Sequence, residues 1–203
     1  MKNQLEAFRL IEKNSSIMGG IFTLSDLQIL FGTNNRVLLH RRIQSFEEND
    51  ILFRFCRGFY VTQNCDLEML SARIYPASYI SFGTVLARSL LIGSVPEKTV
   101  TAVKRGRNRE FSGICGTIVY VGCAEHVMTG YLREQKGNYA LPEKAVLDVL
   151  YYYQKGHRFS FDPFSDIDFS RLNRERLQGL LCGYRNPKFR SFVEGIFSGN
   201  EHE

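Results

Sequence analysis

Long uncharged apolar segments and closely spaced cysteines are both missing from this sequence, and each absence excludes a class of protein. No stretch approaches the roughly 18 consecutive apolar residues of a membrane-spanning helix. Charges interrupt the apolar positions of the N-terminal segment MKNQLEAFRLIEK, which predicts an amphipathic helix rather than a signal peptide. The five cysteines are odd in number and include no C-x-x-C motif, so neither paired disulfides nor a cysteine-rich zinc site is expected. We therefore expect a soluble, cytoplasmic protein with reduced thiols and no membrane partner.

Patterns that mark common catalytic and metal sites are missing as well. No serine lies in a G-x-S-x-G motif, so a serine hydrolase has no support. His126 and His157 stand apart from any cysteine or carboxylate pattern that would form a ligand set. The acidic segment FDPFSDIDF lacks the glycine and terminal glutamate of a calcium loop, and it predicts turn and cap positions instead. We expect no catalytic residue, no metal and no cofactor.

The composition is that of an ordinary folded protein. Hydrophobic residues make up 44% and charged residues 23%, and there is no repeat or low-complexity tract. A chain of 203 residues suffices for one medium domain or two small ones. The net charge of +5 allows a polyanionic partner. Basic residues outnumber acidic ones on both sides of residue 62, so only their clustering can locate a site.

The segment from Thr23 to Val61 has the order of elements of a winged helix-turn-helix. Thr23 and Asp26 approximate a capping box for a short helix, LSDLQILF, which Gly32 ends. After the turn TNN comes a basic helix, RVLLHRRIQSFEEND, and then a hairpin of LFRFC and FYV around Arg57-Gly58. In this arrangement the second helix reads the major groove and the hairpin forms a wing.

A helical wheel divides the basic helix into a core stripe of Leu39, Ile43 and Phe46 and an opposite polar face. No acidic residue occurs between Asp26 and Glu47. Arg41 is the better candidate for a base edge, whereas Arg42 falls near the buried stripe, where it can extend toward a phosphate or an acid. The expected DNA contacts are Asn34, Asn35, Arg36, Val37, His40, Arg41, Arg42 and Gln44, with Arg54 and Arg57 on the wing. The alternative is a solvated helix whose arginines contact nothing specific.

Beyond the polar hinge Gln63-Asn64, residues 66–203 predict a larger α/β domain, so we divide the chain into domains 1–62 and 66–203. Helices are expected in DLEMLSARI, in FGTVLARSLL with Ser81 as its cap, and from Pro142 to Gly156. Strands are expected in KTVTAVKRG, TIVYVGC, VMTGYLRE and NYALP, followed by two closing helices. The fold class is α+β, with a small mixed or antiparallel sheet flanked by helices.

The densest positive patch of the chain is formed by Lys104, Arg105, Arg107 and Arg109. We place it in a glycine-containing loop between two strands. It is either a solvated loop or a second contact surface for nucleic acid or for the target of the domain.

Four segments together resemble the AbiEi-type antitoxin family, the transcriptional regulators of type IV toxin–antitoxin modules. They are RRIQSFEENDILFRFCRGFYV, YISFGTVLA, YALPEKAVLDVLYYYQKG and YRNPKF, and the resemblance runs nearly from end to end. The pattern A-x-PEKA-x-x-D is its most family-like part, whereas many repressors share the winged-helix pattern.

The resemblance implies a protein with two tasks. The winged helix binds repeats in the promoter of its own operon as a repressor, and a dimer on this double-stranded DNA is one arrangement it allows. The second domain counteracts a nucleotidyltransferase-like toxin encoded alongside, without a stable complex between the two proteins.

The alternative function is a nucleic-acid-processing enzyme, with an active or degenerate nuclease-like C-terminal domain docked by the winged helix. A restriction-nuclease core needs acids on adjacent strands to hold magnesium, with a lysine close by. The strand TIVYVGC has no acid, and Glu97 and Lys104 lie at opposite ends of one strand. We therefore expect a protein that is not an enzyme.

Overall fold

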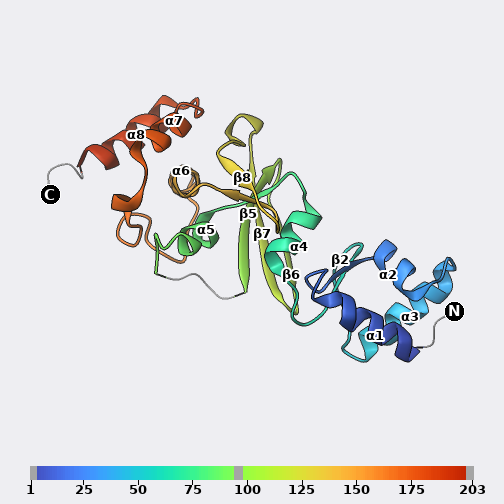
Figure 1. The fold of residues 1–203 in the computed structure, drawn as a ribbon. Helices are drawn as coiled ribbons and strands as arrows, with labels where there is room; N and C mark the ends of the chain where they lie inside the picture. Colours follow the sequence, from blue (N-terminus) through green and yellow to red (C-terminus); the bar gives the residue numbers. More distant parts are fainter. Residues whose placement is uncertain (1–3, 94–97, 200–203) are drawn as a thin grey trace.

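The computed structural model describes residues 4–93 and 98–199, and it arranges them in successive layers from the N-terminal helices to the C-terminal ones (Figure 1). The N-terminal unit contains three helices and a small antiparallel sheet with the strand order β1-β3-β2. Its elements are α1 (Gln4–Ser15), β1 (Ile21–Thr23), α2 (Leu24–Phe31), α3 (Arg36–Glu48), β2 (Phe53–Cys56) and β3 (Phe59–Val61). The predicted helices and hairpin are all present, and β1 is an additional strand that pairs with β3.

Local side-chain bonds set the boundaries of the helix-turn-helix. The hydroxyl of Thr23 accepts a hydrogen bond from the backbone N–H of Asp26, and the Asp26 carboxylate accepts one from the N–H of Thr23, which completes the predicted capping box. Gly32 ends α2 with a φ of 62°, a left-handed conformation that a glycine adopts without steric cost. Asn35 then caps α3, because its Oδ1 accepts from the N–H groups of Val37 and Leu38.

The second unit is built on a mixed six-stranded sheet with the order β6-β7-β5-β4-β9-β8. β5 runs parallel to β7 and β4 runs parallel to β9, whereas the other neighbouring pairs are antiparallel. The strands are β4 (Tyr79–Ile80), β5 (Thr99–Arg105), β6 (Arg109–Gly113), β7 (Gly116–Cys123), β8 (Tyr131–Arg133) and β9 (Asn138–Ala140). The α+β fold class with a mixed sheet is confirmed, although the sequence analysis did not predict β4 or β6.

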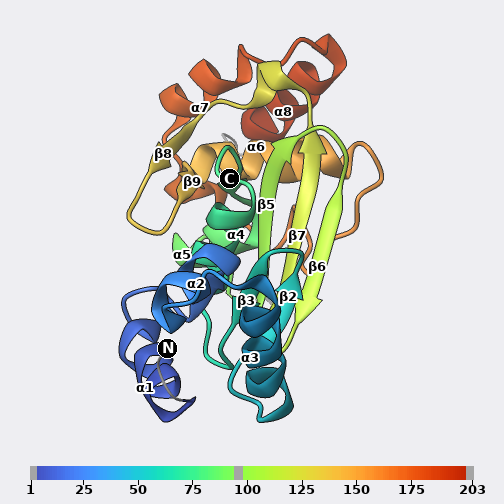
Figure 2. The same ribbon diagram turned by 90° about the vertical axis from the view of Figure 1, so that its right-hand side faces the viewer.

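Helices cover both faces of this sheet. α4 (Leu67–Ile74) lies on the face toward the N-terminal unit, and α5 (Phe82–Arg88) and α6 (Pro142–Tyr153) lie on the opposite face (Figures 1 and 2). α7 (Arg174–Leu181) and α8 (Pro187–Gly199) pack on the outer side of α6. Two 3-10 turns, η1 (Glu125–Val127) and η2 (Phe169–Arg171), lie in the connections. The sheet is therefore enclosed between the N-terminal unit and the C-terminal helices.

A charged pair is buried in the core of the second unit. Lys144 and Asp148 lie one turn apart on α6, with Lys144 Nζ 2.5 Å from Asp148 Oδ1. The second carboxylate oxygen of Asp148 accepts from the hydroxyls of Ser81 at 2.7 Å and Tyr79 at 3.1 Å. Lys144 also donates to the Tyr184 hydroxyl at 2.7 Å. Each charge is thus compensated by polar partners from several elements, as burial requires.

One expectation for this region is corrected. Ser81 precedes α5, but its side chain makes no capping bond because its hydroxyl is donated to Asp148. Glu143 of the PEKA pattern lies in the first turn of α6 and is buried, and its carboxylate accepts from the backbone N–H of Asn173 at 3.1 Å. The polar residues of this pattern therefore lie inside the protein.

We expect Lys144→Met to destabilise the protein strongly, because it leaves the carboxylate of Asp148 buried without a cation. Breaking a buried pair on one side costs about 3–5 kcal/mol, whereas replacing both partners costs less. Urea unfolding of Lys144→Met, Asp148→Asn and the double variant measures the difference. Lys188→Met, at an exposed lysine, is the control and should change stability by no more than about 0.5 kcal/mol. A double variant less stable than both single variants would contradict the interpretation.

Candidate nucleic-acid interface

The surface of α3 that faces away from the core is basic and contains two exposed apolar side chains, Val37 and Leu38. Leu39, Ile43 and Phe46 are buried, as the helical wheel predicts. The exposed side chains on the remaining surface are those of Arg36, Val37, Leu38, His40, Arg41, Gln44 and, at the C-terminal end, Glu48. Val37 is 60% exposed. This surface has the cations and the apolar groups that a major groove can accept.

The two asparagines before α3 are engaged within the protein. The Oδ1 of Asn35 is occupied by the helix cap. The Oδ1 of Asn34 accepts from Nε2 of Gln28 at 3.2 Å, which ties the turn to α2. Both residues therefore contribute to the geometry of the turn that orients α3.

Arg41 and Arg42 differ in their surroundings, as expected from the wheel. The Arg42 guanidinium lies 5.4 Å from the ring centroid of Phe31, and its Nη1 lies 3.5 Å from the carbonyl oxygen of Phe31. Arg42 thus covers the end of α2, whereas Arg41 is exposed. Gln44 donates to Glu48 at 3.0 Å along the same helix. Of these polar residues, Arg41 is the best placed to reach a base.

The wing presents its arginines to solvent and its apolar side chain to the second unit. Arg54 lies on β2 and Arg57 lies in the turn with Gly58, and both arginines are exposed. Phe55, between them in sequence, is buried and packs on Gly113 at the end of β6. A Cβ added to Gly113 would lie only 2.5 Å from a ring carbon of Phe55, so this contact requires a glycine. The wing is therefore docked against the large sheet.

A polar contact from α4 completes the junction of the two units. Arg73 donates to the carbonyl oxygen of Ile21 at 2.8 Å and to the carboxylate of Asp26 at 2.9 Å. Ile21, Phe55 and Val61 belong to the same buried cluster as the core of the second unit. The helix-turn-helix and the large sheet are thus packed together, and the division into domains at 62–66 stays a prediction.

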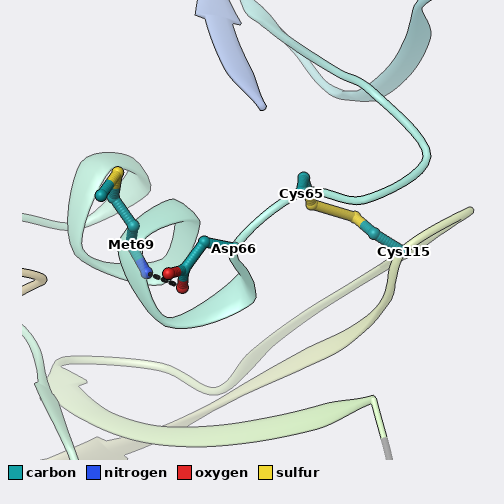
Figure 3. Close-up of a disulfide and its surroundings, with 4 residues drawn as sticks. All are labelled: Cys65, Asp66, Met69 and Cys115. Atoms are coloured by element: carbon teal, nitrogen blue, oxygen red, sulfur yellow. Dashed lines mark hydrogen bonds between the residues drawn. A yellow bond between two sulfur atoms is a disulfide. The ribbon is translucent and has the colours of Figure 1, made fainter. Parts of the chain in front are cut away.

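A disulfide ties Cys65, in the segment that connects the units, to Cys115 of the second unit, and it corrects the expectation of reduced thiols for these two residues (Figure 3). Their Cα atoms are 5.9 Å apart, a distance typical of disulfides, although the two residues are separated by 50 positions in the sequence. Cys65 precedes α4, whose cap is Asp66, and Cys115 lies in the turn between β6 and β7. No spacing motif could reveal this pair, because packing of the turn brings it together.

The second basic patch is smaller than expected. Lys104 is buried on β5, with its ammonium 4.9 Å from the ring centroid of Tyr75 and 3.2 Å from the carbonyl oxygen of Arg105. Arg105 is exposed and lies 3.2 Å from Glu125. Arg107 and Arg109 are exposed, and Arg109 begins the edge strand β6 rather than lying in a loop. The exposed patch therefore consists of Arg105, Arg107 and Arg109.

The other candidate chemistry concerns the acidic segment and the remaining carboxylates. Asp162 Oδ1 accepts from the backbone N–H groups of Phe164 and Ser165, in accordance with the predicted turn position. Within residues 4–93 and 98–199, no group of three His, Cys, Asp or Glu residues is placed to hold a metal ion. Glu97 lies outside the described residues. None of the helices in the described part of the chain has the length and apolar content that a bilayer crossing requires.

Neither the family models nor the curated proteins searched contain a match to this sequence. Among solved structures, the crystal structure of the Rv2827c protein from Mycobacterium tuberculosis is similar, with a TM-score of 0.60 and 14% sequence identity. The match covers 92% of this chain and 73% of that chain, so both units take part in it. The similarity shows that the two proteins share a fold.

The junction at Asp26 predicts a dependence of stability on pH. Burial opposes ionisation of this carboxylate, but the hydrogen bonds from Thr23 and Arg73 outweigh it and hold the pKa of Asp26 below its ordinary value of 3.8. A lowered pKa in the folded state stabilises the fold above pH 3.8, and this contribution is lost as the pH falls through the lowered pKa.

We therefore expect Asp26→Asn to destabilise the protein at pH 6, and we expect this effect to shrink progressively as the pH falls below 3.8. Urea unfolding across this range gives the measurement, and Asp50→Asn, at an exposed residue, is the control with a smaller difference. A pH-independent effect of Asp26→Asn would show that its charge is not involved.

Proposed function

We propose that this protein is a DNA-binding repressor of its own operon and the antitoxin of a type IV toxin–antitoxin module, acting against a nucleotidyltransferase-like toxin. The observation that carries the repressor half is the exposed basic surface of α3 beside the exposed arginines of the wing. The fold shared with Rv2827c is compatible with the family resemblance of the sequence. The antitoxin half rests on that resemblance.

In this proposal each part of the surface has a separate task on DNA. Arg41 donates to the two acceptors of a guanine in the major groove, and Val37 contacts the methyl group of a thymine. Arg36 and His40 lie on the shoulder of α3, where they approach the phosphate backbone. Arg54 and Arg57 extend from the wing toward phosphates or the minor groove. The base contacts specify the sequence, and the phosphate contacts position the protein on it.

The proposed protein works by binding and not by catalysis, with double-stranded DNA as its direct partner. Repeats in the operator would place two copies of the protein side by side on the DNA. Small DNA-binding domains usually gain affinity in this way. The toxin is a functional partner that forms no stable complex with it. Arg105, Arg107 and Arg109 are the candidate surface for this second task, since they are exposed and lie on the second unit.

We expect Arg41→Ala to weaken binding to a duplex from the gene's own upstream region by about 1–3 kcal/mol, and to weaken binding to random DNA much less. Fluorescence anisotropy at one fixed salt concentration measures both affinities. Arg42→Ala is the matched control, because Arg42 packs on Phe31 and should not alter the ratio of the two affinities. Equal losses on the two DNAs would reassign Arg41 to a phosphate contact, and no binding of the upstream duplex by the wild type would reject the repressor.

We expect reversal of Arg105, Arg107 and Arg109 to glutamate to abolish neutralisation of the co-encoded toxin while operator affinity stays nearly intact. The readouts are growth of toxin-expressing cells and anisotropy on the upstream duplex. Reversal of three other exposed arginines, Arg133, Arg158 and Arg185, controls for the change in net charge. Loss of operator binding would assign the patch to the DNA interface, and no change in either readout would identify it as a solvated surface.

A further inference from the structure

We infer that the Cys65–Cys115 disulfide is a redox switch that controls operator affinity by fixing the DNA-binding unit against the large sheet. The inference rests on the proposed binding of DNA and concerns its regulation. In the oxidised protein the wing and α3 have one orientation relative to the second unit. In the reduced protein only non-covalent contacts maintain that orientation.

Cys65 lies where the chain passes from one unit to the other. It follows β3 by four residues and precedes the helix α4. Before it, the backbone N–H of Thr62 donates to the carbonyl oxygen of Gly20. After it, the backbone N–H of Asp66 donates to the carbonyl oxygen of Gly19. The crossing segment is therefore held to the end of the N-terminal unit, and a bond at Cys65 acts directly on the junction.

Cys115 lies in a turn that is wedged between the wing and α4. On one side, Gly113 packs under the ring of Phe55. On the other, a Cβ at Gly116 would lie 2.2 Å from the carbonyl oxygen of Lys98 and 2.6 Å from a methyl carbon of Leu67. The disulfide thus ties the junction to the same turn on which the wing is docked (Figure 3).

We expect opening of the bond to change the orientation of the units more than their folding, because the N-terminal helices have a buried cluster of their own. The N-terminal cluster around Ile11, Phe31 and Phe46 contains no residue beyond Tyr60. After reduction the units remain joined by the Arg73 contacts, by the packing of Phe55 on Gly113, and by Ile21 and Val61 in the shared buried cluster. These contacts are all non-covalent, so they hold the orientation of the two units less firmly than a covalent bond does. A mobile wing lowers affinity, because binding must then fix an orientation that the disulfide had already set.

The exchange reaction balances with a small thiol as the reductant. A thiolate attacks the Cys65 sulfur, which is half-buried and more accessible than the Cys115 sulfur, and the Cys115 thiolate leaves and takes up a proton. A second thiol then displaces Cys65 as its thiol and is released as the oxidised disulfide of the reductant. Two electrons pass from two small thiols to the protein, and oxidation is the reverse.

Two of the three other cysteines, Cys56 and Cys123, are poor competitors for this pair. Burial raises the pKa of Cys56, and it raises the pKa of Cys123 to about 11, so neither supplies much thiolate at neutral pH. Cys182 is exposed on the far side of α6, at the end of α7. Cys182 is thus the accessible free thiol for which the test needs a control variant.

The test compares full-length protein oxidised with glutathione disulfide and reduced with a phosphine, on the labelled upstream duplex. We expect reduction to weaken binding about 5-fold or more, the lower end of typical coupling between sites. Cys65→Ser and Cys115→Ser should bind like the reduced wild type under both conditions, and Cys182→Ser should respond like the wild type. If a serine variant folds poorly, the affinities of the oxidised and the reduced wild type still test the switch.

Two failures are distinguishable. Equal affinity of both redox forms, with the bond verified by mass spectrometry, overturns the switch and leaves the repressor intact. Absence of binding in both forms overturns the repressor and the switch together. Hydrogen exchange supports the switch only if reduction increases exchange in residues 53–66 and 110–117 while the interior of α6 stays protected.

Discussion

The carboxylate of Asp26 connects the helix-turn-helix to everything else in this structure. It closes the capping box at the start of α2 and, at the same time, accepts from Arg73 of α4. Arg73 donates in turn to the carbonyl oxygen of Ile21, in the strand that immediately precedes α2. This ion pair therefore joins the first turn of α2 to α4, and it acts together with the packing of Phe55 on Gly113 and the Cys65–Cys115 disulfide in placing the N-terminal unit against the large sheet. Because α3 is oriented through α2 and the turn, the direction of the candidate reading surface depends on this pair as well.

Features governed by neighbours in sequence were predictable, and features governed by distant partners were not. The capping box, the left-handed Gly32 and the core stripe of α3 each depend on residues within one or two turns. β6 was missed because it is an edge strand whose exposed Arg109 and Glu110 give no apolar alternation. β4 has only two residues, and its pairing with β5 and β9 is what makes it a strand. The exposure of Lys104 was misjudged because Tyr75, from the end of α4, covers it.

The pattern that carries the family resemblance is mostly internal. Glu143, Lys144 and Asp148 are all buried, and their partners come from β4, α7 and the segment before α8. A charge in such a place is tolerated only with well-placed partners, so the pattern specifies how these elements assemble. A resemblance to the family that rests on this buried pattern therefore supports a shared fold more directly than a shared binding surface. The exposed basic surfaces to which we assign the proposed functions lie elsewhere, on α3, on the wing and on the loop before β6.

The docking of the wing gives the two proposed tasks a physical connection. Phe55 lies between Arg54 and Arg57 in sequence, and it packs on the strand β6, which begins at Arg109. The wing arginines and the basic patch thus lie at opposite ends of one short chain of contacts through Phe55 and β6. A ligand that shifts β6 on binding has one affinity for the protein with the wing docked and another for the protein with the wing undocked. If DNA binding fixes the wing, DNA changes the affinity for that ligand, and the ligand changes the affinity for DNA by the same factor. Operator occupancy and the activity of the second unit are then linked through packing, without contact between their partners.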